Sequence, residues 1–343
     1  MNLAILFGGA SYEHEISIVS AITLKEKLSA LDVNFIFLDQ DHTFYLIDTS
    51  KMDAKTFSTR SYKKEPLLEL KKGGFAHKSF FGSKTFSFER VVNLIHGADG
   101  EDATIASLFD FYKIDYIGPR KDASVVSFDK FMTKAYASVC GVDTVSYELL
   151  KGERETRFEL PCIIKPTRLG SSIGVGIVHK EEELDYALDV AYEFDDRLLI
   201  EPFIQGVKEY NLAGCMTENG LEFSIIEEPH KEEFLDFDKK YLDFSRSEQA
   251  READIPEELK QELYAAFEKI YMPLFEGALI RCDFFVVEGK VLLNEINPIP
   301  GSMANYLFDD FAGLIEKISL PKKKEIKVNY TYLHSIRSAK GKA

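Results

Sequence analysis

The chain has 343 residues, which is too long for one ordinary hydrophobic core and predicts two or three domains. Acidic residues outnumber basic residues by 57 to 42, and the net charge of −15 argues against a general nucleic-acid or anionic-membrane binder. The four cysteines show neither metal-ligand spacing nor a secreted disulfide pattern, and no apolar stretch is long enough to span a membrane. The N-terminal apolar run has no basic leader and ends in two glycines, so we expect a first strand and a cytoplasmic protein.

The first part of the chain is expected to form an α/β domain. Leu3–Phe7 has the pattern of a strand, a helical pattern follows, and Val33–Leu38 is the next strand of a parallel sheet. Residues 48–90 are polar and poorly periodic apart from a predicted hairpin around Gly82, so we interpret them as an elaboration. A buried strand at Val91–Ile95 and a helix capped by Asp102 complete the domain before the break at residues 118–119.

The middle of the chain predicts a compact α+β unit. A long helix is expected from Asp122 to Gly141, and its inward residues are expected to be Val125, Val126, Phe128, Phe131, Met132, Ala135 and Val139. Strands at 162–165, 174–178 and 198–201 and a helix at about 181–194 follow. The remainder predicts strands near 209–216 and 222–227, a charged stretch at about 228–252, a helix from about 256, and a hairpin.

The hairpin at 279–297 carries the most informative polar residues. A three-residue loop centred on Gly289 places Asp283 opposite Glu295 and Arg281 opposite Asn297, all on one sheet face. A two-residue loop at 288–289 would move Glu295 to the other face. Two carboxylates and an amide oxygen form a hard oxygen site suited to magnesium bridged to phosphates, although a hairpin with one solvated face explains the same pattern.

Glycine-rich segments form a second group of candidates. Gly8–Gly9 precede a helix, where Glu13 suits a substrate ammonium group or, alternatively, the dipole of the first helical turn. The segment 165–176 lies between two strands and can fold over nucleotide phosphates with Lys165, Ser171 and Ser172, although a flexible surface hairpin is the alternative. Neither segment has the spacing of a dinucleotide fingerprint or a Walker motif.

Several smaller features suggest the same kind of site. Glu201 and Ile204 lie in an expected hinge that suits an adenine edge, and Glu209 suits a ribose hydroxyl, although both acids also fit ordinary strand ends. Lys240 and Tyr241 lie in the charged stretch, which is long enough for a lid but also fits a solvated loop. The third glycine segment, 297–302, frees the Gly301 amide. His96 follows a buried strand where open α/β sheets bind ligands, and a structural histidine is equally compatible.

Eight segments in series resemble the D-alanine–D-alanine ligase family of the ATP-grasp superfamily. They are LFGGASYEHEIS, IHGADGEDAT, FDKFMTK, IIKPTRLGSSIGV, LLIEPFI, KKY, IRCDFFV and NEINPIPGS, in the order of the family. The resemblance covers nearly the whole chain. It implies three domains, at residues 1–120, 121–202 and 203–343, with a lid loop at about 228–252 and the nucleotide site between the central and C-terminal domains.

The resemblance also implies a role for each candidate residue. Lys130, Lys165 and Lys240 would contact ATP phosphates, with Ser171 and Ser172 in the phosphate loop. Glu201, Ile204 and Glu209 would hold the nucleoside. Asp283, Glu295 and Asn297 would hold two Mg²⁺ ions, with Mn²⁺ as an alternative. The expected substrate and catalytic residues are Glu13, His96, Ser171, Lys240, Tyr241, Arg281, Gly301 and Tyr306.

The implied reaction joins two D-alanine molecules through a D-alanyl phosphate, with release of ADP and phosphate, for peptidoglycan synthesis. The resemblance also implies a homodimer. Two positions depart from the family pattern. Leu169 replaces a glutamate expected to link Ser171 to Tyr241, and Tyr306 stands where a serine would contact the second substrate. Another ATP-grasp ligase and a non-catalytic nucleotide-binding regulator remain as alternatives, whereas the missing fingerprint disfavours a dehydrogenase.

Overall fold

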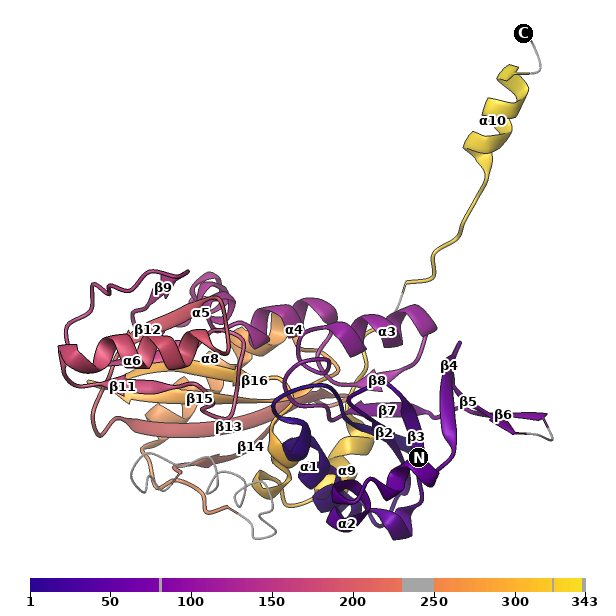
Figure 1. The fold of residues 1–343 in the computed structure, drawn as a ribbon, viewed down its shortest axis with the longest axis horizontal. Helices are drawn as coiled ribbons and strands as arrows, with labels where there is room; N and C mark the ends of the chain where they lie inside the picture. Colours follow the sequence, from indigo (N-terminus) through magenta and orange to yellow (C-terminus); the bar gives the residue numbers. More distant parts are fainter. Residues whose placement is uncertain (80–81, 230–249, 323, 341–343) are drawn as a thin grey trace.

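The structure, a computed structural model, describes residues 1–79, 82–229, 250–322 and 324–340. Three sheets organise the described chain, and Figure 1 shows the first at one end of the body and the other two at the opposite end. The chain belongs to the mixed α/β class, as predicted. No helix among the described residues is long and apolar enough to cross a membrane.

The first sheet has eight strands in the order β6-β5-β4-β3-β2-β1-β7-β8. β1 lies parallel to β2 and β7, and β7 lies parallel to β8, whereas β2 to β6 pair antiparallel. The predicted elaboration therefore extends the sheet. The strands are β1 Asn2–Gly8, β2 Asp32–Leu38, β3 Phe44–Ile47, β4 Leu67–Lys71, β5 Gly74–Ser79, β6 Gly82–Phe86, β7 Arg90–Asn93 and β8 Tyr116–Ile117.

Helices cover both faces of this sheet. One face packs against α1 (His14–Lys27), α2 (Ala54–Ser58) and the C-terminal elements η3 (Gly301–Leu307) and α9 (Phe311–Lys317) in a single core. The other face packs against α3 (Thr104–Tyr112). Short 3-10 helices η1 (Thr49–Lys51) and η2 (Ser61–Lys64) complete this part. Because η3 follows the last strand of the third sheet, this shared core joins the first sheet to the segment that leaves the third sheet.

The second and third sheets are each four-stranded and antiparallel. The second, in the order β11-β10-β12-β9, is covered by α6 (Glu181–Tyr192), and its strands are β9 Glu148–Leu150, β10 Cys162–Pro166, β11 Gly176–Val178 and β12 Leu198–Pro202. The third, in the order β14-β13-β15-β16, packs against α8 (Glu257–Leu274), and its strands are β13 Lys208–Thr217, β14 Gly220–Glu227, β15 Leu279–Val287 and β16 Lys290–Asn297. The division at residues 120 and 202 falls between the sheets and stays a proposal.

The predicted long helix is wrong, because the chain breaks it into α4 (Lys121–Phe128) and α5 (Lys130–Val139). Asp129 between them has an extended backbone, and its carboxylate caps α5 by accepting bonds from the amides of Phe131 and Met132. The break also changes the buried face. Val125, Met132 and Val139, expected inside, are exposed, and the buried positions are Ala123, Ser124, Ser127, Thr133, Lys134 and Ala137.

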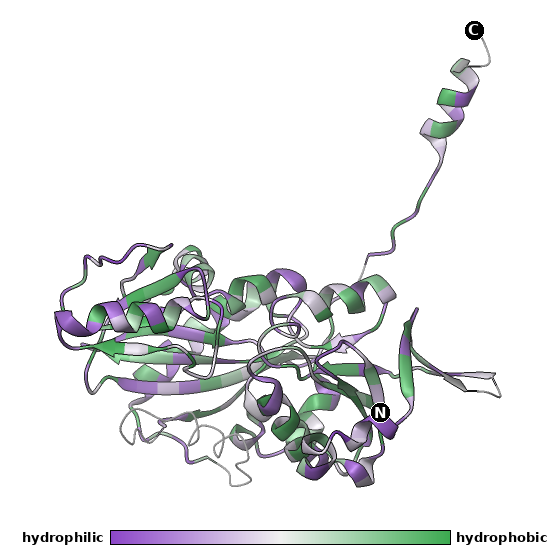
Figure 2. Ribbon diagram, in the orientation of Figure 1, coloured by the Kyte–Doolittle hydropathy of each residue, from purple (hydrophilic) through white to green (hydrophobic). Residues whose placement is uncertain are grey.

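The C-terminal segment extends away from the body and ends in α10 (Thr331–Lys340), as Figure 1 shows. Figure 2 shows that this helix carries both strongly hydrophobic and strongly hydrophilic residues, and Tyr332, Leu333 and Ile336 are exposed.

Candidate active site

The hairpin of β15 and β16 brings its four polar residues together in the predicted register. Arg281 pairs with Asn297, and Asp283 pairs with Glu295. The loop is not the expected one. Val287 pairs with Lys290 across a two-residue turn, in which Glu288 and Gly289 both have positive φ. A register shift between Asp283 and Phe284 then leaves the extra residue on β16 and restores the predicted pairing.

Arg281 and Asp283 form a buried bidentate ion pair at the centre of this hairpin. The guanidinium donates to both Asp283 oxygens at 2.7 and 2.8 Å, and the Asn297 amide donates to Asp283 Oδ2 at 3.0 Å. Burial raises the pKa of Asp283 to about 7, although the Arg281 charge opposes the rise. Burial alone would lower the pKa of Arg281, but Asp283 outweighs burial and holds it well above its ordinary value. Arg281 also donates to the Tyr306 hydroxyl at 3.2 Å.

The donor set around Asp283 fits a hard cation. Two carboxylates and an amide oxygen are ligands that Mg²⁺ prefers. Within the described ranges, no group of three or more His, Cys, Asp or Glu side chains is arranged to hold a metal. Both Asp283 oxygens are already used by Arg281 and Asn297. Oδ1 accepts one of these bonds and Oδ2 accepts two, so a lone pair on Oδ1 is left for a cation.

Glu201, on β12 of the second sheet, lies between two lysines. Lys165 on β10 donates to Glu201 Oε2 at 2.6 Å, and Lys134 on α5 forms an ion pair with Glu201 Oε1. Burial would raise the pKa of Glu201, but the two lysine charges outweigh it and lower the pKa to about 2. Glu201 is therefore a carboxylate at neutral pH. Ile204 follows on the same segment and is half-buried, and Glu209 lies on β13 opposite Phe285.

The glycine loop between β10 and β11 closes over Lys130 and Glu13. Lys130 Nζ donates to the Leu169 carbonyl at 2.5 Å, and Ser171 Oγ donates to Glu13 Oε1 at 2.6 Å. Burial and the nearby Glu101 raise the pKa of Glu13, and the Ser171 bond opposes that rise. Ser171 and Ser172 both have positive φ, which folds the loop tightly. The loop thus connects an expected phosphate residue with an expected substrate residue.

His96 belongs to a buried hydrogen-bond chain that reaches the third glycine segment. Its Nε2 lies 3.2 Å from Ser20 Oγ, and Ser20 Oγ accepts a 3.0 Å bond from the Ser302 amide. Burial lowers the pKa of His96 to about 4, so the imidazole is neutral at pH 7. Gly301 is buried at the start of η3, beside Ser302. These hydrogen bonds therefore hold the segment that begins at Gly301 against α1.

Two cavities lie where the glycine loop meets the first and third sheets. One of about 40 Å³ is lined by residues from all three sheet regions, including Glu101, Lys130, Gly170, Glu295 and Asn297. A larger one of about 790 Å³ opens beside it. Its lining includes Tyr12, Glu13, Gly97, Leu169 and Phe194. The cavity therefore reaches Glu13, the carboxylate that is expected to bind the substrate ammonium group.

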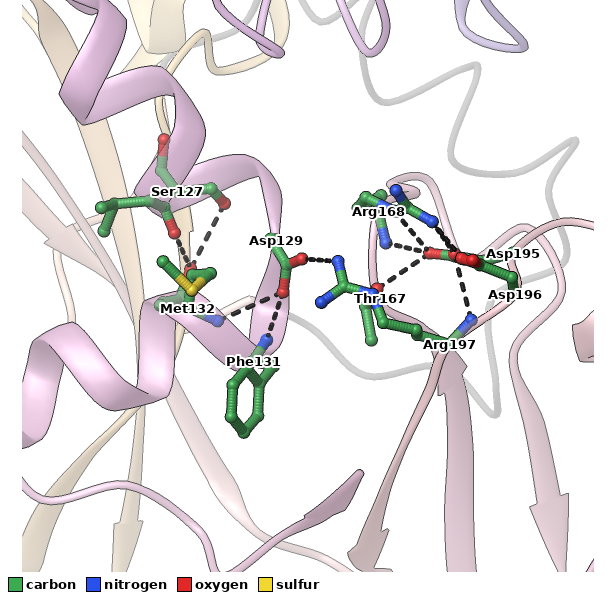
Figure 3. A network of polar contacts seen from close by, with 11 residues as sticks. Ser127, Asp129, Phe131, Met132, Thr167, Arg168, Asp195, Asp196 and Arg197 are labelled. Atoms are coloured by element: carbon green, nitrogen blue, oxygen red, sulfur yellow. Dashed lines mark hydrogen bonds and ion pairs between the residues drawn. The ribbon is translucent and has the colours of Figure 1, made fainter. Parts of the chain in front are cut away.

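A polar network contacts the start of the glycine loop at Thr167 and Arg168, as Figure 3 shows. Asp195 accepts bonds from Thr167 Oγ1 at 2.9 Å and from the Arg168 amide at 2.8 Å, and it also pairs with the Arg168 guanidinium. Arg197 pairs with Asp129, the residue that caps α5. The network thus fixes the start of the loop relative to the helix that carries Lys130.

Comparisons with known proteins agree with this geometry. The family model described as D-ala D-ala ligase N-terminus matches residues 2–119, and the model described as D-ala D-ala ligase C-terminus matches residues 133–312. The chain belongs to the D-alanine–D-alanine ligase family. A relative named D-alanine–D-alanine ligase, from Sulfurimonas denitrificans, is 62% identical over 346 residues, covering 100% of both chains.

Two solved structures in this family have the same fold. The D-alanine–D-alanine ligase of Helicobacter pylori superposes with a TM-score of 0.84 at 49% identity, over 94% of this chain and 100% of that one. The enzyme of Coxiella burnetii gives 0.72 at 26% identity, over 88% and 85% of the two chains. The predicted ATP-grasp fold is confirmed. Enzymes of this family are ATP-dependent.

Leu169, which stands where the family pattern has a glutamate, contributes to the site through its backbone. Its side chain is buried, and its carbonyl accepts the bond from Lys130. Ser171 is instead linked to Glu13, so the loop does not depend on position 169 for this contact. Lys240 and Tyr241 lie outside the described residues. The role assigned to each site residue stays a prediction.

Sequence reasoning missed three contributors to the D-alanine–D-alanine ligase site. They are Lys134, Ser20 and the Asp195 network. Lys134 stands four residues after Lys130, a spacing that places both side chains on one helix face, so this pattern was available. Ser20 and Asp195 gave no comparable signal, because their partners lie 76 and 28 residues away along the chain.

Proposed function

We propose that the protein joins two D-alanine molecules to D-alanyl-D-alanine with conversion of ATP to ADP and phosphate. The observation that carries this proposal is the Glu13–Ser171 hydrogen bond beside Lys130, because it joins a buried carboxylate suited to an ammonium group to a glycine loop suited to phosphates. The family membership supports the same substrates, because the relatives are named for this reaction.

The first step activates a carboxylate that is otherwise a poor acyl donor. A carboxylate oxygen of the first D-alanine attacks the γ-phosphorus of ATP, the bond to the β–γ bridging oxygen breaks, and ADP leaves. Lys130 and Lys165 offset the charge of the two approaching anions, and Glu13 holds the ammonium group. Asp283, Glu295 and Asn297 would hold two Mg²⁺ ions, which supply further charge neutralisation at the phosphates.

The second step forms the peptide bond. The amine of the second D-alanine attacks the acyl carbon of the D-alanyl phosphate, the tetrahedral intermediate collapses with loss of inorganic phosphate, and one amine proton is released. Arg281 and the Gly301 amide stabilise the oxyanion of that intermediate. The hydroxyl of Tyr306 contacts Arg281, the group that would stabilise this charge, and is suited to the carboxylate of the second D-alanine. His96, which is neutral, would lie near the first D-alanine.

Four further properties belong to the same proposal. Glu201, Ile204 and Glu209 would hold the nucleoside, and Lys240 and Tyr241 would close the site as parts of the lid. The protein would act in the cytoplasm, where D-alanine and ATP are available for peptidoglycan synthesis. We also propose a homodimer, on the family resemblance alone.

The test is phosphate release from Mg-ATP with D-alanine, L-alanine, glycine or D-lactate as the added substrate. Release that depends on D-alanine, rises with second-order concentration dependence, and yields a dipeptide by mass spectrometry supports the proposal. Glu295→Gln should abolish turnover without changing the unfolding midpoint. ATP binding without D-alanine-dependent release would favour a different ATP-grasp ligase.

A further inference from the structure

The cluster of Lys134, Glu201 and Lys165 contains one cation more than its carboxylate requires. Each oxygen of Glu201 is taken by a different lysine, since Lys165 contacts Oε2 and Lys134 contacts Oε1. The side chains of Lys134 and Glu201 are each only 2% exposed. Burial of an ammonium group is costly, and a single lysine would already neutralise Glu201. The second buried lysine therefore calls for an explanation.

The two lysines differ in how they are held. Lys134 lies in the interior of α5, and the ring centroid of Tyr147 lies 5.8 Å from its Nζ. Lys165 lies near the end of β10, directly before the glycine loop, and its side chain is 14% exposed. Lys165 can therefore turn toward a phosphate above the loop, whereas Lys134 is enclosed by Glu201 and the Tyr147 ring.

We propose that Lys134 is a positioning residue that keeps Glu201 ionised and correctly oriented when Lys165 moves from Glu201 to the phosphates of ATP. This inference rests on the proposed nucleotide site. Without ATP, both lysines contact the carboxylate, and the three side chains together carry a charge of +1, with Glu295 as a nearby opposing charge. With ATP bound, Lys165 pairs with phosphate, and Lys134 and Glu201 remain as a neutral buried pair.

This arrangement has a consequence for nucleotide choice. An ionised Glu201 can only accept hydrogen bonds, so it favours the 6-amino donor of adenine over the 6-oxo acceptor of hypoxanthine. A protonated or displaced Glu201 loses that discrimination. Lys134 therefore sets base specificity through Glu201 without touching the nucleotide itself.

The experiment measures Kd for ATP and for inosine triphosphate by titration, with the full-length wild-type protein and Lys134→Met. We expect Lys134→Met to raise the Kd for ATP about tenfold or more and the Kd for inosine triphosphate much less, because a hydrogen bond to a charged group is lost only with ATP. The preference for ATP should therefore fall by about fivefold or more. Lys134→Arg, which keeps the charge, should retain most of the preference.

Lys121→Met is the matched control, because Lys121 also forms an ion pair but lies exposed on α4. If Lys134 acts only in packing, Lys134→Met will weaken both nucleotides equally and leave their ratio unchanged, and that result overturns the proposal. Should Lys134→Met fail to fold, Lys134→Gln is read in the same way. Because the assay needs no D-alanine, its result is separate from the phosphate-release test of the reaction.

Discussion

Ser171 donates a 2.6 Å hydrogen bond to Glu13 although the two residues lie 158 positions apart in the sequence. The contact joins the glycine loop to the turn that starts α1, so an expected phosphate loop and an expected substrate carboxylate are fixed together. The other Glu13 oxygen is buried and has no hydrogen-bond partner among the described residues. A buried, partly unsatisfied carboxylate suits an incoming ammonium group.

Gly170→Ala tests how closely the loop must approach Glu13. A β-carbon at this position would lie 2.7 Å from Glu13 Oε1, whereas the backbone of Gly170 is not in the left-handed region. We expect KM for D-alanine to rise about tenfold or more, because the displaced carboxylate cannot hold its bond to Ser171. The unfolding midpoint should change little. Steady-state kinetics and thermal unfolding measure the two effects, and an unchanged KM would contradict the assignment of Glu13 to the substrate.

A second contact to the turn before α1 is aromatic and comes from the segment after α6. The rings of Tyr12 and Phe194 meet edge to face, with centroids 5.5 Å apart. We expect Tyr12→Ala and Phe194→Ala each to raise KM for D-alanine, and the double variant to be no worse than either one. Such pairs contribute roughly 0.5–1.5 kcal/mol beyond their buried area, and non-additivity is the sign of direct coupling.

Tyr186→Ala is the control for that double-variant cycle, since Tyr186 is an exposed tyrosine on α6, the helix that precedes Phe194. Its kinetics should match those of the wild type. Strictly additive effects of the two single variants would show that the Tyr12–Phe194 contact does not couple the turn before α1 to the segment after α6.

The sequence predicts the local parts of this site well and its assembly poorly. The pairing of Asp283 with Glu295 follows from strand alternation, yet the loop behind it was assigned incorrectly. A β-bulge is not visible in a period-two pattern, and here it compensates for the shorter turn. The break at Asp129 was missed for a related reason. In the sequence, Asp129 resembles an ordinary polar residue within a helix, and its role as a cap is clear only from the amides that it contacts.

The family resemblance grouped distant segments at one site, but it did not predict which of their side chains are in contact. Nothing in the local pattern around Glu13 indicates that Ser171 is its partner. The burial of Lys134 also contradicts the usual preference of lysine for the surface, and its partners Glu201 and the Tyr147 ring are known only from the structure. Sequence patterns therefore suggested which residues carry charge at the site, whereas the fold determines which of these charges meet.

The ionisation of Glu201 predicts a pH-dependent contribution to stability. Its pKa falls from 4.5 to about 2 on folding, because the charges of Lys165 and Lys134 outweigh the effect of burial. The contribution is fully present above about pH 4.5 and is lost as the pH falls toward 2. We expect the difference in free energy of unfolding between wild type and Glu201→Gln to be about 1.4 kcal/mol smaller at pH 3.5 than at pH 7. Urea unfolding at several pH values measures it, and a constant difference would falsify the lowered pKa.

Asp129→Ala tests the polar network that holds Lys130 and the glycine loop. The substitution removes the cap of α5 and leaves Arg197 without its partner carboxylate. Loss of a cap costs about 1 kcal/mol, and a partly buried charge without its partner costs roughly 1–3 kcal/mol more. We therefore expect the free energy of unfolding to fall by roughly 2–4 kcal/mol.

Asp129→Asn separates the two parts of that loss, because it keeps a capping oxygen but not the charge. It should recover about 1 kcal/mol of stability relative to Asp129→Ala. Both variants should also raise KM for ATP, since α5 begins at Lys130 and the Lys130 amide bonds to the Thr167 carbonyl at 2.8 Å. A loss of stability with an unchanged KM for ATP would mean that this network supports the fold without positioning the phosphate loop.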